Sequence, residues 1–288
     1  MNQRLPVWFK QRIPRAGETT RVERLLTGLN LHTVCQGAHC PNMGQCFTSG
    51  TATFMIMGDV CTRNCTFCAV GKGKPLPLDE HEPAHVAEAV KTLGLNYVVI
   101  TCVTRDDLAD GGAAHFAETV KSLHAAVPGL RVEVLVSDFK GSHESVKIVA
   151  ESAPEVFAHN LETVPRLYPF VRPMADYRRS LEVLRRAKEL NPALVTKSGL
   201  MLGLGEEQAE VIAVMRDLRQ AGCELLSLGQ YLAPSQSHHP VVEFVTPERF
   251  AEYEQIGLRE GFKGVASAPL VRSSFRAGEL FDRAMQAQ

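Results

Sequence analysis

Three cysteines lie close together in the segment Cys61-Thr-Arg-Asn-Cys65-Thr-Phe-Cys68, with the spacing C-x3-C-x2-C. Thiolates favour zinc, copper(I) or iron–sulfur clusters, and three of them on one short loop can hold three irons of a four-iron cluster. The fourth iron is then open to bind and reduce a ligand. Structural zinc is the alternative, but it prefers four Cys or His ligands, and no matching fourth ligand lies close by in the sequence. We therefore predict a cluster with one open iron.

A second group of cysteines precedes the first, in Cys35-Gln-Gly-Ala-His-Cys40-Pro-Asn-Met-Gly-Gln-Cys46. General metal chemistry does not require this C-x4-C-x5-C spacing. The two groups hold six of the eight cysteines, and a disulfide framework suits short secreted chains rather than a chain of 288 residues. Clustered thiols in a reducing compartment are more often metal ligands. Both groups are therefore interpreted as ligands, and Cys102 and Cys223 as small core residues.

The composition limits the kind of protein that this can be. With 45% hydrophobic residues, the chain can bury a core large enough for one large domain. The formal net charge of -1 gives no indication of a nucleic-acid or membrane partner. The N-terminus carries no apolar stretch long enough for a signal peptide, and no apolar run approaches the roughly 20 residues of a membrane-spanning helix. We expect a protein that works in the cytoplasm or an equivalent compartment, with neither kind of partner.

After Gly50 the chain alternates short apolar runs, typical of buried strands, with longer amphipathic stretches, typical of helices. The expected strands are 54–57, 97–101, 131–136, 156–159, 196–201 and 225–230. The expected helices are 84–93, 113–126, 144–151, 178–190 and 206–220. Six strand–helix units indicate parallel strands with right-handed crossovers, and a complete barrel has eight. We predict an α/β fold with a partial (β/α)6 TIM-type barrel, and a doubly wound open sheet is the alternative.

Two segments outside this alternation divide the chain into three parts. Residues 1–50, rich in Gly, Pro, Arg and polar residues, form an N-terminal extension with the second cysteine group. Residues 51–235 form the barrel, and residues 236–288 form a C-terminal extension with a helix near 247–260. The first cysteine group directly follows the first strand, and parallel α/β folds place their sites at the carboxyl ends of strands. We therefore expect both extensions to cover the barrel mouth.

The C-x3-C-x2-C loop followed by a partial barrel resembles the radical S-adenosylmethionine superfamily. In that superfamily the amino and carboxylate groups of S-adenosylmethionine chelate the open iron of a 4Fe-4S cluster. An electron from the cluster then cleaves a carbon–sulfur bond and yields a 5′-deoxyadenosyl radical, which abstracts hydrogen from unactivated carbons. The resemblance implies that Cys61, Cys65 and Cys68 hold this cluster. The motif indicates the superfamily strongly and the reaction only weakly.

With the second cysteine group, the chain resembles the lipoyl synthase family in particular. The resemblance implies that Cys35, Cys40 and Cys46 hold an auxiliary 4Fe-4S cluster whose sulfide is the sulfur donor. It extends over nearly the whole chain, through stretches that end a candidate strand or follow one closely. Besides an opening stretch at 6–10, these stretches are 103–112, 160–163, 171–173, 197–206, 230–232 and 238–241.

The family resemblance also implies a serine ligand from the tail. In the family, a serine of a C-terminal Arg-Ser-Ser-Tyr motif holds the remaining iron of the auxiliary cluster. Here residues 272–275 read Arg-Ser-Ser-Phe. Phe in place of Tyr leaves the ligand intact and removes a possible phenol hydrogen bond. Ser274 is the predicted ligand, and Ser273 is the alternative.

Five residues near strand ends are candidates for holding S-adenosylmethionine. Gly111 and Gly112 allow close backbone approach to its methionine end, with a helix-entry turn as the alternative. Asn160 and Glu162 alternate along a strand end, so both could point into the barrel mouth and hold the ribose or the amino group. A satisfied buried polar pair is the alternative for these two. Arg172 could meet a carboxylate or carbonyl, or form a structural salt bridge.

The resemblance implies sulfur insertion at carbons six and eight of an octanoyl group attached to a lysine of a lipoyl carrier domain. The carrier would be the glycine cleavage H protein or a dehydrogenase E2 subunit, and the electron donor ferredoxin or flavodoxin. A methylthiotransferase-like enzyme with an auxiliary cluster is the nearest alternative, although such enzymes carry an RNA-binding module for which the sequence offers no basic stretch. A zinc-binding interaction module without catalysis is the alternative from a different class.

Overall fold

The structure, a computed structural model, describes residues 4–11, 14–15 and 17–286. The other residues of the two predicted extensions, 1–3, 12–13, 16 and 287–288, lie outside this description. The strands are β1 (His32–Thr33), β2 (Thr53–Ile56), β3 (Val60–Cys61), β4 (Gly71–Lys72), β5 (Tyr97–Cys102), β6 (Arg131–Leu135), β7 (Val156–Ala158), β8 (Val195–Leu202), β9 (Leu225–Gln230) and β10 (Gly264–Ser267).

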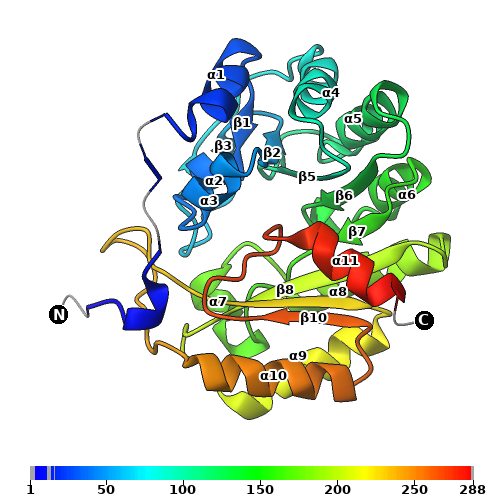
Figure 1. The fold of residues 1–288 in the computed structure, drawn as a ribbon. Helices are drawn as coiled ribbons and strands as arrows, with labels where there is room; N and C mark the ends of the chain where they lie inside the picture. Colours follow the sequence, from blue (N-terminus) through cyan, green and yellow to red (C-terminus); the bar gives the residue numbers. More distant parts are fainter. Residues whose placement is uncertain (1–3, 12–13, 16, 287–288) are drawn as a thin grey trace.

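One large sheet organises the molecule. It has eight strands in the order β1-β2-β5-β6-β7-β8-β9-β10, and β3 and β4 form a separate pair. Strands β2 and β5–β10 run parallel to one another, whereas β1 is antiparallel to β2. Since sequential parallel strands lie side by side, their carboxyl ends meet at one edge, where loops from distant parts of the chain come together (Figure 1).

Helices connect and cover these strands (Figure 1). The α-helices are α1 (Thr20–Gly28), α2 (Val34–Gly37), α3 (Met43–Thr48), α4 (Glu82–Leu93), α5 (Ala113–Ala126), α6 (His143–Glu151), α7 (Tyr168–Val171), α8 (Tyr177–Leu190), α9 (Gln208–Gln220), α10 (Pro247–Arg259) and α11 (Ala277–Gln286). Short 3-10 helices cover Val7–Phe9, Phe139–Gly141 and Pro165–Leu167. Local chemistry sets several of the ends. Asp176 caps α8 by accepting from the Arg179 amide, and Gly94 ends α4 with a left-handed φ of 69°.

The predicted partial barrel is confirmed, and the structure adds a further strand to it. The six predicted strands are β2 and β5–β9, and the predicted helices are α4, α5, α6, α8 and α9, each within two residues of the expected ends. In the region expected to hold one helix and a tail, α10 leads into β10, which continues the parallel sheet beside β9. β10 has only four residues, too few to show a clear apolar period in the sequence.

Helix α11 packs against the amino ends of the strands. Its Leu280 and Ala284 form an apolar cluster with Val156, Val195 and Leu225, which are the first residues of β7, β8 and β9. The sequence pattern predicts only a tail here. The apolar stripe of α11 therefore covers this end of the barrel, and the carboxyl ends of the strands are left for a site.

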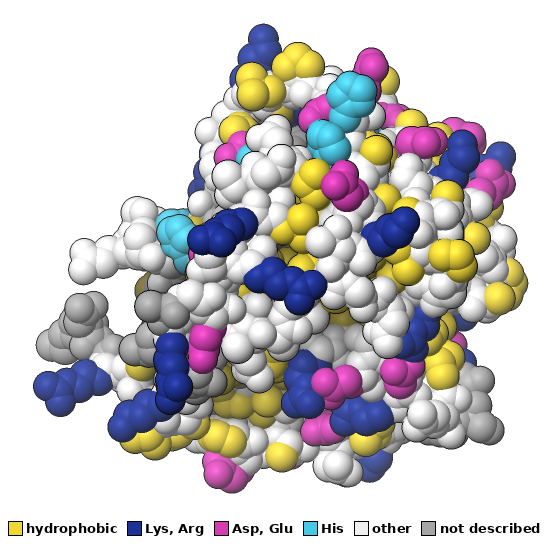
Figure 2. All heavy atoms as spheres, turned by 45° about the horizontal axis from the view of Figure 1, so that its top comes forward, with side chains coloured by type: hydrophobic (Ala, Val, Ile, Leu, Met, Phe, Trp, Pro, Cys, Tyr) yellow, Lys and Arg dark blue, Asp and Glu magenta, His cyan; other side chains and the backbone are white. Residues whose placement is uncertain are grey.

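The outer surface is mixed in character. Figure 2 shows one face, on which basic, acidic and hydrophobic side chains are interspersed. Of the helices in the described part of the chain, none is both long and apolar enough to cross a membrane.

Candidate active site

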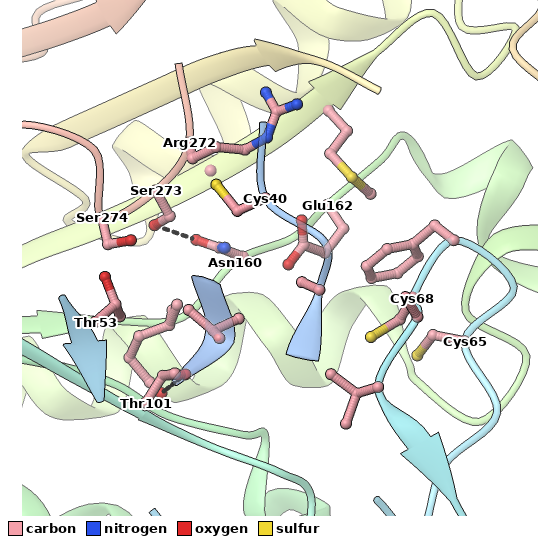
Figure 3. A pocket seen from close by; sticks show the side chains of 18 of the residues that line it. Cys40, Thr53, Cys65, Cys68, Thr101, Asn160, Glu162, Arg272, Ser273 and Ser274 are labelled. Carbon is pink, nitrogen blue, oxygen red and sulfur yellow. Dashed lines mark hydrogen bonds between the residues drawn. The ribbon is translucent and has the colours of Figure 1, made fainter. Parts of the chain in front are cut away.

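A cavity of about 530 Å³ lies at the carboxyl ends of the parallel strands. Figure 3 shows Cys65 and Cys68 at one side, Cys40 and Ser274 at the other, and Glu162 between them. The predicted site residues that line this cavity are Cys35, Cys40, Cys61, Cys65, Cys68, Asn160, Glu162, Arg172 and Ser274. The two cysteine groups and the tail, far apart in the sequence, thus contribute to one space.

The loop that carries Cys61, Cys65 and Cys68 follows β2 and is held by several elements. Thr62 Oγ1 donates to the Thr104 carbonyl beyond β5 at 2.9 Å. The Thr66 amide donates to the carbonyl of Val171, the last residue of α7, at 3.0 Å. The three thiols are half-buried and free of disulfides. The contacts of Thr62 and Thr66 therefore hold the loop against the barrel mouth.

Arg63, inside this loop, joins it to the barrel through two carboxylates. Its Nε lies 2.7 Å from Asp106 Oδ2, and its Nη2 lies 2.6 Å from Oδ1 of the fully buried Asp138. Asp138 Oδ2 also accepts from Arg179 Nε at 2.7 Å. Burial alone would raise the pKa of Asp138, but the hydrogen bond and charge of Arg63 outweigh it and hold that pKa well below its usual range. The carboxylate is therefore ionised at neutral pH and fixes the loop.

Replacing Asp138 with asparagine should weaken this anchor. Asp138→Asn keeps the shape but removes the charge that Arg63 and Arg179 share. We expect the free energy of unfolding of the cluster-free protein, measured by urea denaturation, to fall by about 3 kcal/mol, as when a buried ion pair is broken. Glu182→Gln, which loses solvent-accessible pairs with Arg185 and His143, is the control and should cost less than about 1 kcal/mol. Equal effects of the two variants would contradict the anchoring role.

The second cysteine group lies on α2, α3 and the turn between them. Cys35 is buried in α2, Cys46 is half-buried in α3, and the Cys40 amide donates to the Cys35 carbonyl at 3.0 Å. Burial, with smaller contributions from the nearby Cys35 and Cys40, raises the pKa of Cys46 to about 12. The three thiols therefore lie near one another, although Cys46 itself does not line the cavity. Each must lose its proton when it binds a metal.

The two serines of the tail have different surroundings. Ser273 Oγ donates to Asn160 Oδ1 at 3.1 Å, and the Ser273 carbonyl accepts from Lys197 Nζ at 2.7 Å. Ser274 Oγ has no hydrogen-bond partner among the residues that the structure describes. The Ser273 hydroxyl is thus engaged, whereas that of Ser274 is available to a ligand in the cavity.

Asn160 and Glu162 both line the cavity just beyond β7. Glu162 has a φ of 67°, which is uncommon for a residue with a side chain. Its backbone is held there because its amide donates to the Gly199 carbonyl and its carbonyl accepts from the Met201 amide. Burial raises the pKa of Glu162, and the charge of Arg172 opposes this. A strained backbone held this firmly is typical of functional sites.

Arg172, which also lines the cavity, supports the same strand end. Its Nη1 donates to the carbonyls of Asn160 and Leu161, both at 3.0 Å, and to the hydroxyl of Tyr168 at 3.1 Å. The sequence leaves two alternatives for Arg172, a carboxylate or carbonyl partner and a structural salt bridge. The structure shows hydrogen bonds with backbone carbonyls. Arg172 therefore positions residues 160–161, and a direct contact with S-adenosylmethionine stays a prediction.

His159 is a further candidate that the sequence analysis did not name. Its Nδ1 lies 2.9 Å from the Val136 carbonyl, so this nitrogen carries the proton, and its buried Nε2 has no partner among the described residues. Burial and the charge of Arg172 lower the pKa of His159 to about 4. A neutral acceptor that lines the cavity suits a ligand hydroxyl or amine. The sequence signal that could have identified His159 is its position directly before Asn160, at the end of a predicted strand.

Gly111 and Gly112 lie apart from the cavity lining and form the turn into α5. Their φ angles are 62° and 88°, and Asp110 Oδ1 accepts from the Gly112 amide at 2.9 Å. A Cβ at Gly112 would lie 2.1 Å from Met57 Sδ, so close packing also requires glycine here. This is the helix-entry turn that was the alternative for these residues. Their contact with S-adenosylmethionine stays a prediction.

Comparisons with known proteins agree with the α/β partial barrel described above. The family model of the radical SAM superfamily matches residues 55–218. Among solved structures, the FeFe-hydrogenase maturase HydG from Carboxydothermus hydrogenoformans superposes with a TM-score of 0.61, at 14% identity over 94% of this chain and 68% of that one. Methylornithine synthase PylB superposes with a TM-score of 0.52, at 16% identity over 79% of this chain and 71% of that one. The chain is a member of the radical SAM superfamily, which implies a 4Fe-4S cluster and S-adenosylmethionine.

Sequence relatives narrow this assignment. The family model described as the N-terminal domain of lipoyl synthase matches residues 1–40. A lipoyl synthase of Caldanaerobacter subterraneus subsp. tengcongensis is 58% identical, over 96% of this chain and 97% of its own. One of Rubrobacter xylanophilus is 53% identical, over 95% and 85%, and one of Pseudomonas putida is 54% identical, over 95% and 81%. Within the superfamily, the chain belongs to the lipoyl synthase family.

Proposed function

We propose that this enzyme inserts sulfur at carbons six and eight of an octanoyl group bound to a lysine of a carrier domain, using two 4Fe-4S clusters and S-adenosylmethionine. The observation that supports this most directly is that both cysteine groups and Ser274 border one cavity. Two sulfur insertions on one acyl chain need the hydrogen-abstracting group and the sulfur donor within reach of the same carbons. A shared cavity meets that need.

The residues present fit two clusters. Cys61, Cys65 and Cys68 would hold the cluster that binds S-adenosylmethionine, and the group Cys35, Cys40 and Cys46 with Ser274 would hold the auxiliary cluster. In the described ranges, no three or more His, Cys, Asp or Glu side chains converge on one metal ion. The ligands of a 4Fe-4S cluster bind different irons, so they need not converge in that way.

When bound, the clusters and S-adenosylmethionine supply the radical and the sulfur. The chain supplies position and an environment without water. Asn160, Glu162 and the Nε2 of His159, which line the cavity or point to it, would bind the polar groups of S-adenosylmethionine. Apolar lining residues such as Met55 and Leu200 match the hydrocarbon chain of an octanoyl group and exclude water from its reacting carbons.

The partners and the organisation of the chain form part of the same proposal. The carrier would be the glycine cleavage H protein or a dehydrogenase E2 subunit, and the electron donor ferredoxin or flavodoxin. We further propose a cytoplasmic location, where thiolates stay reduced. In the three-part division, residues 1–50 contribute auxiliary ligands, 51–235 form the barrel, and 236–288 contribute the serine.

Mass spectrometry of a substrate peptide tests the proposed reaction. The reconstituted enzyme is incubated anaerobically with an octanoylated lysine peptide, S-adenosylmethionine and a chemical reductant. We expect the peptide to gain two sulfur atoms as the dithiol, or two sulfur atoms less two hydrogens once the thiols are oxidised to the dithiolane. The reaction without S-adenosylmethionine is the control. An unmodified peptide in the presence of 5′-deoxyadenosine would contradict the proposed substrate class.

Two substitutions of Ser274 test its proposed double role. An alkoxide is a harder ligand than a thiolate and is unusual on iron–sulfur clusters. A serine could take up a proton and leave, which would free its iron when sulfide is consumed. Ser274→Cys should therefore assemble the auxiliary cluster but stall turnover, whereas Ser274→Ala should assemble a more labile cluster. We expect product to fall at least about tenfold in both variants, as when a ligand environment is disturbed.

Iron content and product yield measured together separate the two roles. Full conversion by Ser274→Cys would exclude the role in iron release. Wild-type behaviour of Ser274→Ala would exclude ligation by Ser274, and Ser273 would be tested next. Cys223→Ala is the control, because Cys223 is a buried thiol outside both ligand groups.

A further inference from the structure

An ion pair lies inside the barrel, below the cavity. Lys197, the third residue of β8, places its Nζ 2.7 Å from Glu133 Oε1 and 2.9 Å from Glu133 Oε2 on β6. Both side chains are 0% exposed. Tyr97, the first residue of β5, donates its hydroxyl to Glu133 Oε2 at 2.7 Å. Neither charged residue lines the cavity itself.

Stability alone does not account for this pair. Removing two charges from water is costly, and well-packed apolar residues in place of a buried ion pair often leave stability equal or higher. An apolar pair could fill the same space. A lysine ammonium differs in having three N–H donors, of which two point to Glu133. The third donates to the Ser273 carbonyl at 2.7 Å.

We infer that Lys197, held by Glu133, is a positioning residue that seats the tail segment carrying Ser274. This inference rests on the proposed role of Ser274 as a cluster ligand. The Ser273 carbonyl belongs to the peptide unit that leads into Ser274, so holding it restricts where the Ser274 hydroxyl can point. A charge-assisted hydrogen bond in a buried site is stronger and more directional than a neutral one at the surface.

Other contacts hold the tail at residues 270–271. The positioning of the Ser273 carbonyl is therefore left to Lys197. Asn42 Nδ2, from the N-terminal extension, donates to the Leu270 carbonyl at 2.7 Å. At Gly229 of β9 a Cβ would lie 2.0 Å from the Val271 carbonyl, so the tail lies directly on the strand backbone. These contacts fix residues 270–271. Ser273 is held by the Lys197 ammonium at its carbonyl and by Asn160 at its hydroxyl.

Hydrogen exchange in the cluster-free protein tests this role without relying on activity. The variant Lys197→Met/Glu133→Gln removes both charges together and so leaves no unpaired buried ion. We expect backbone amides of residues 271–276 to exchange at least about tenfold faster, because loops that lose their anchors open at low free-energy cost. In the reconstituted protein, iron of the auxiliary cluster should pass to a chelator about 10- to 100-fold faster, the range for a lost supporting contact.

Two control variants separate positioning from a general loss of stability. Tyr97→Phe keeps the Lys197–Ser273 hydrogen bond and should exchange nearly as wild type. Lys188→Met/Glu224→Gln removes a pair of the same chemistry at the edge of the barrel, with an Nζ–Oε2 distance of 2.8 Å, together with the pair of Glu224 and Lys263. It should leave the tail unchanged. If the main variant does not fold, Lys197→Met/Glu133→Leu, which likewise leaves no unpaired buried ion, should give the same increase in tail exchange.

The outcomes distinguish this inference from the proposed function. Unchanged tail exchange in a folded Lys197→Met/Glu133→Gln or Lys197→Met/Glu133→Leu variant would overturn the positioning role, and the wild-type reaction would still stand. A looser tail with an unaltered auxiliary cluster would overturn the link to Ser274. Failure of the wild-type protein to thiolate the peptide would count against the proposed function instead.

Discussion

Changing Cys61, Cys65 and Cys68 together to alanine is expected to abolish the formation of 5′-deoxyadenosine from S-adenosylmethionine. The three thiolates are the predicted ligands of the cluster that binds S-adenosylmethionine, and alanine offers no ligand atom in their place. The loss should exceed the roughly 100-fold that removal of an outer supporting contact can cause. Chromatography of the nucleoside products after anaerobic incubation with dithionite measures it.

The same variant should retain the other cluster. Its iron content should fall from about eight to about four per chain, since each cluster has four irons. Cys223→Ala, which removes a buried thiol outside both groups, should keep full iron content and full cleavage. Undiminished cleavage of S-adenosylmethionine by the triple variant would show that the radical-forming cluster is bound elsewhere.

The parts of the fold that the sequence predicted are those with strong local signals. Strands such as β5 and β9 are short apolar runs bounded by polar residues, and α5 is amphipathic over its whole length, so periodicity locates them. By contrast, β1 has two residues and β10 has four. Their pairing depends on neighbouring strands that lie elsewhere in the sequence, so no local pattern announces them.

The candidate site was predictable to the extent that it depends on residue type and spacing. The cysteines are distinctive in the sequence, and their loop follows a predicted strand. The partners that hold this loop are not distinctive. Arg63 and Asp138 are 75 positions apart, and nothing in either segment indicates the other. Only the parallel sheet, which aligns the ends of β2 and β6 at one edge, brings them together.

The buried ion pair was hidden for a related reason. Lys197 and Glu133 lie 64 positions apart, on strands that β7 separates, and each reads as a polar residue within an apolar strand. The sheet register and the inward direction of both side chains are needed to bring them together. The same holds for the tail, because segment 270–274 consists of turns and irregular backbone without periodicity. Its place is set by contacts with β8, β9 and the N-terminal extension.

Changing Cys35, Cys40 and Cys46 together to alanine is expected to give the opposite pattern. These residues are distinct from the first group in spacing and lie on α2, α3 and the turn between them. Reductive cleavage of S-adenosylmethionine should therefore continue at a rate within about twofold of wild type, a change that corresponds to less than about 0.5 kcal/mol in the barrier. Sulfur insertion should disappear, because the predicted sulfur donor is absent.

Both readouts come from one anaerobic reaction with an octanoylated lysine peptide. 5′-Deoxyadenosine should accumulate while the peptide mass shows no added sulfur, and the iron content should again be about four per chain. Loss of cleavage together with loss of product would mean that the second group supports the fold of the cavity rather than sulfur donation, and a circular dichroism melt would then reveal the lost stability. If thiolated peptide still formed in the triple variant, the sulfur would have to come from a source other than a cluster held by Cys35, Cys40 and Cys46.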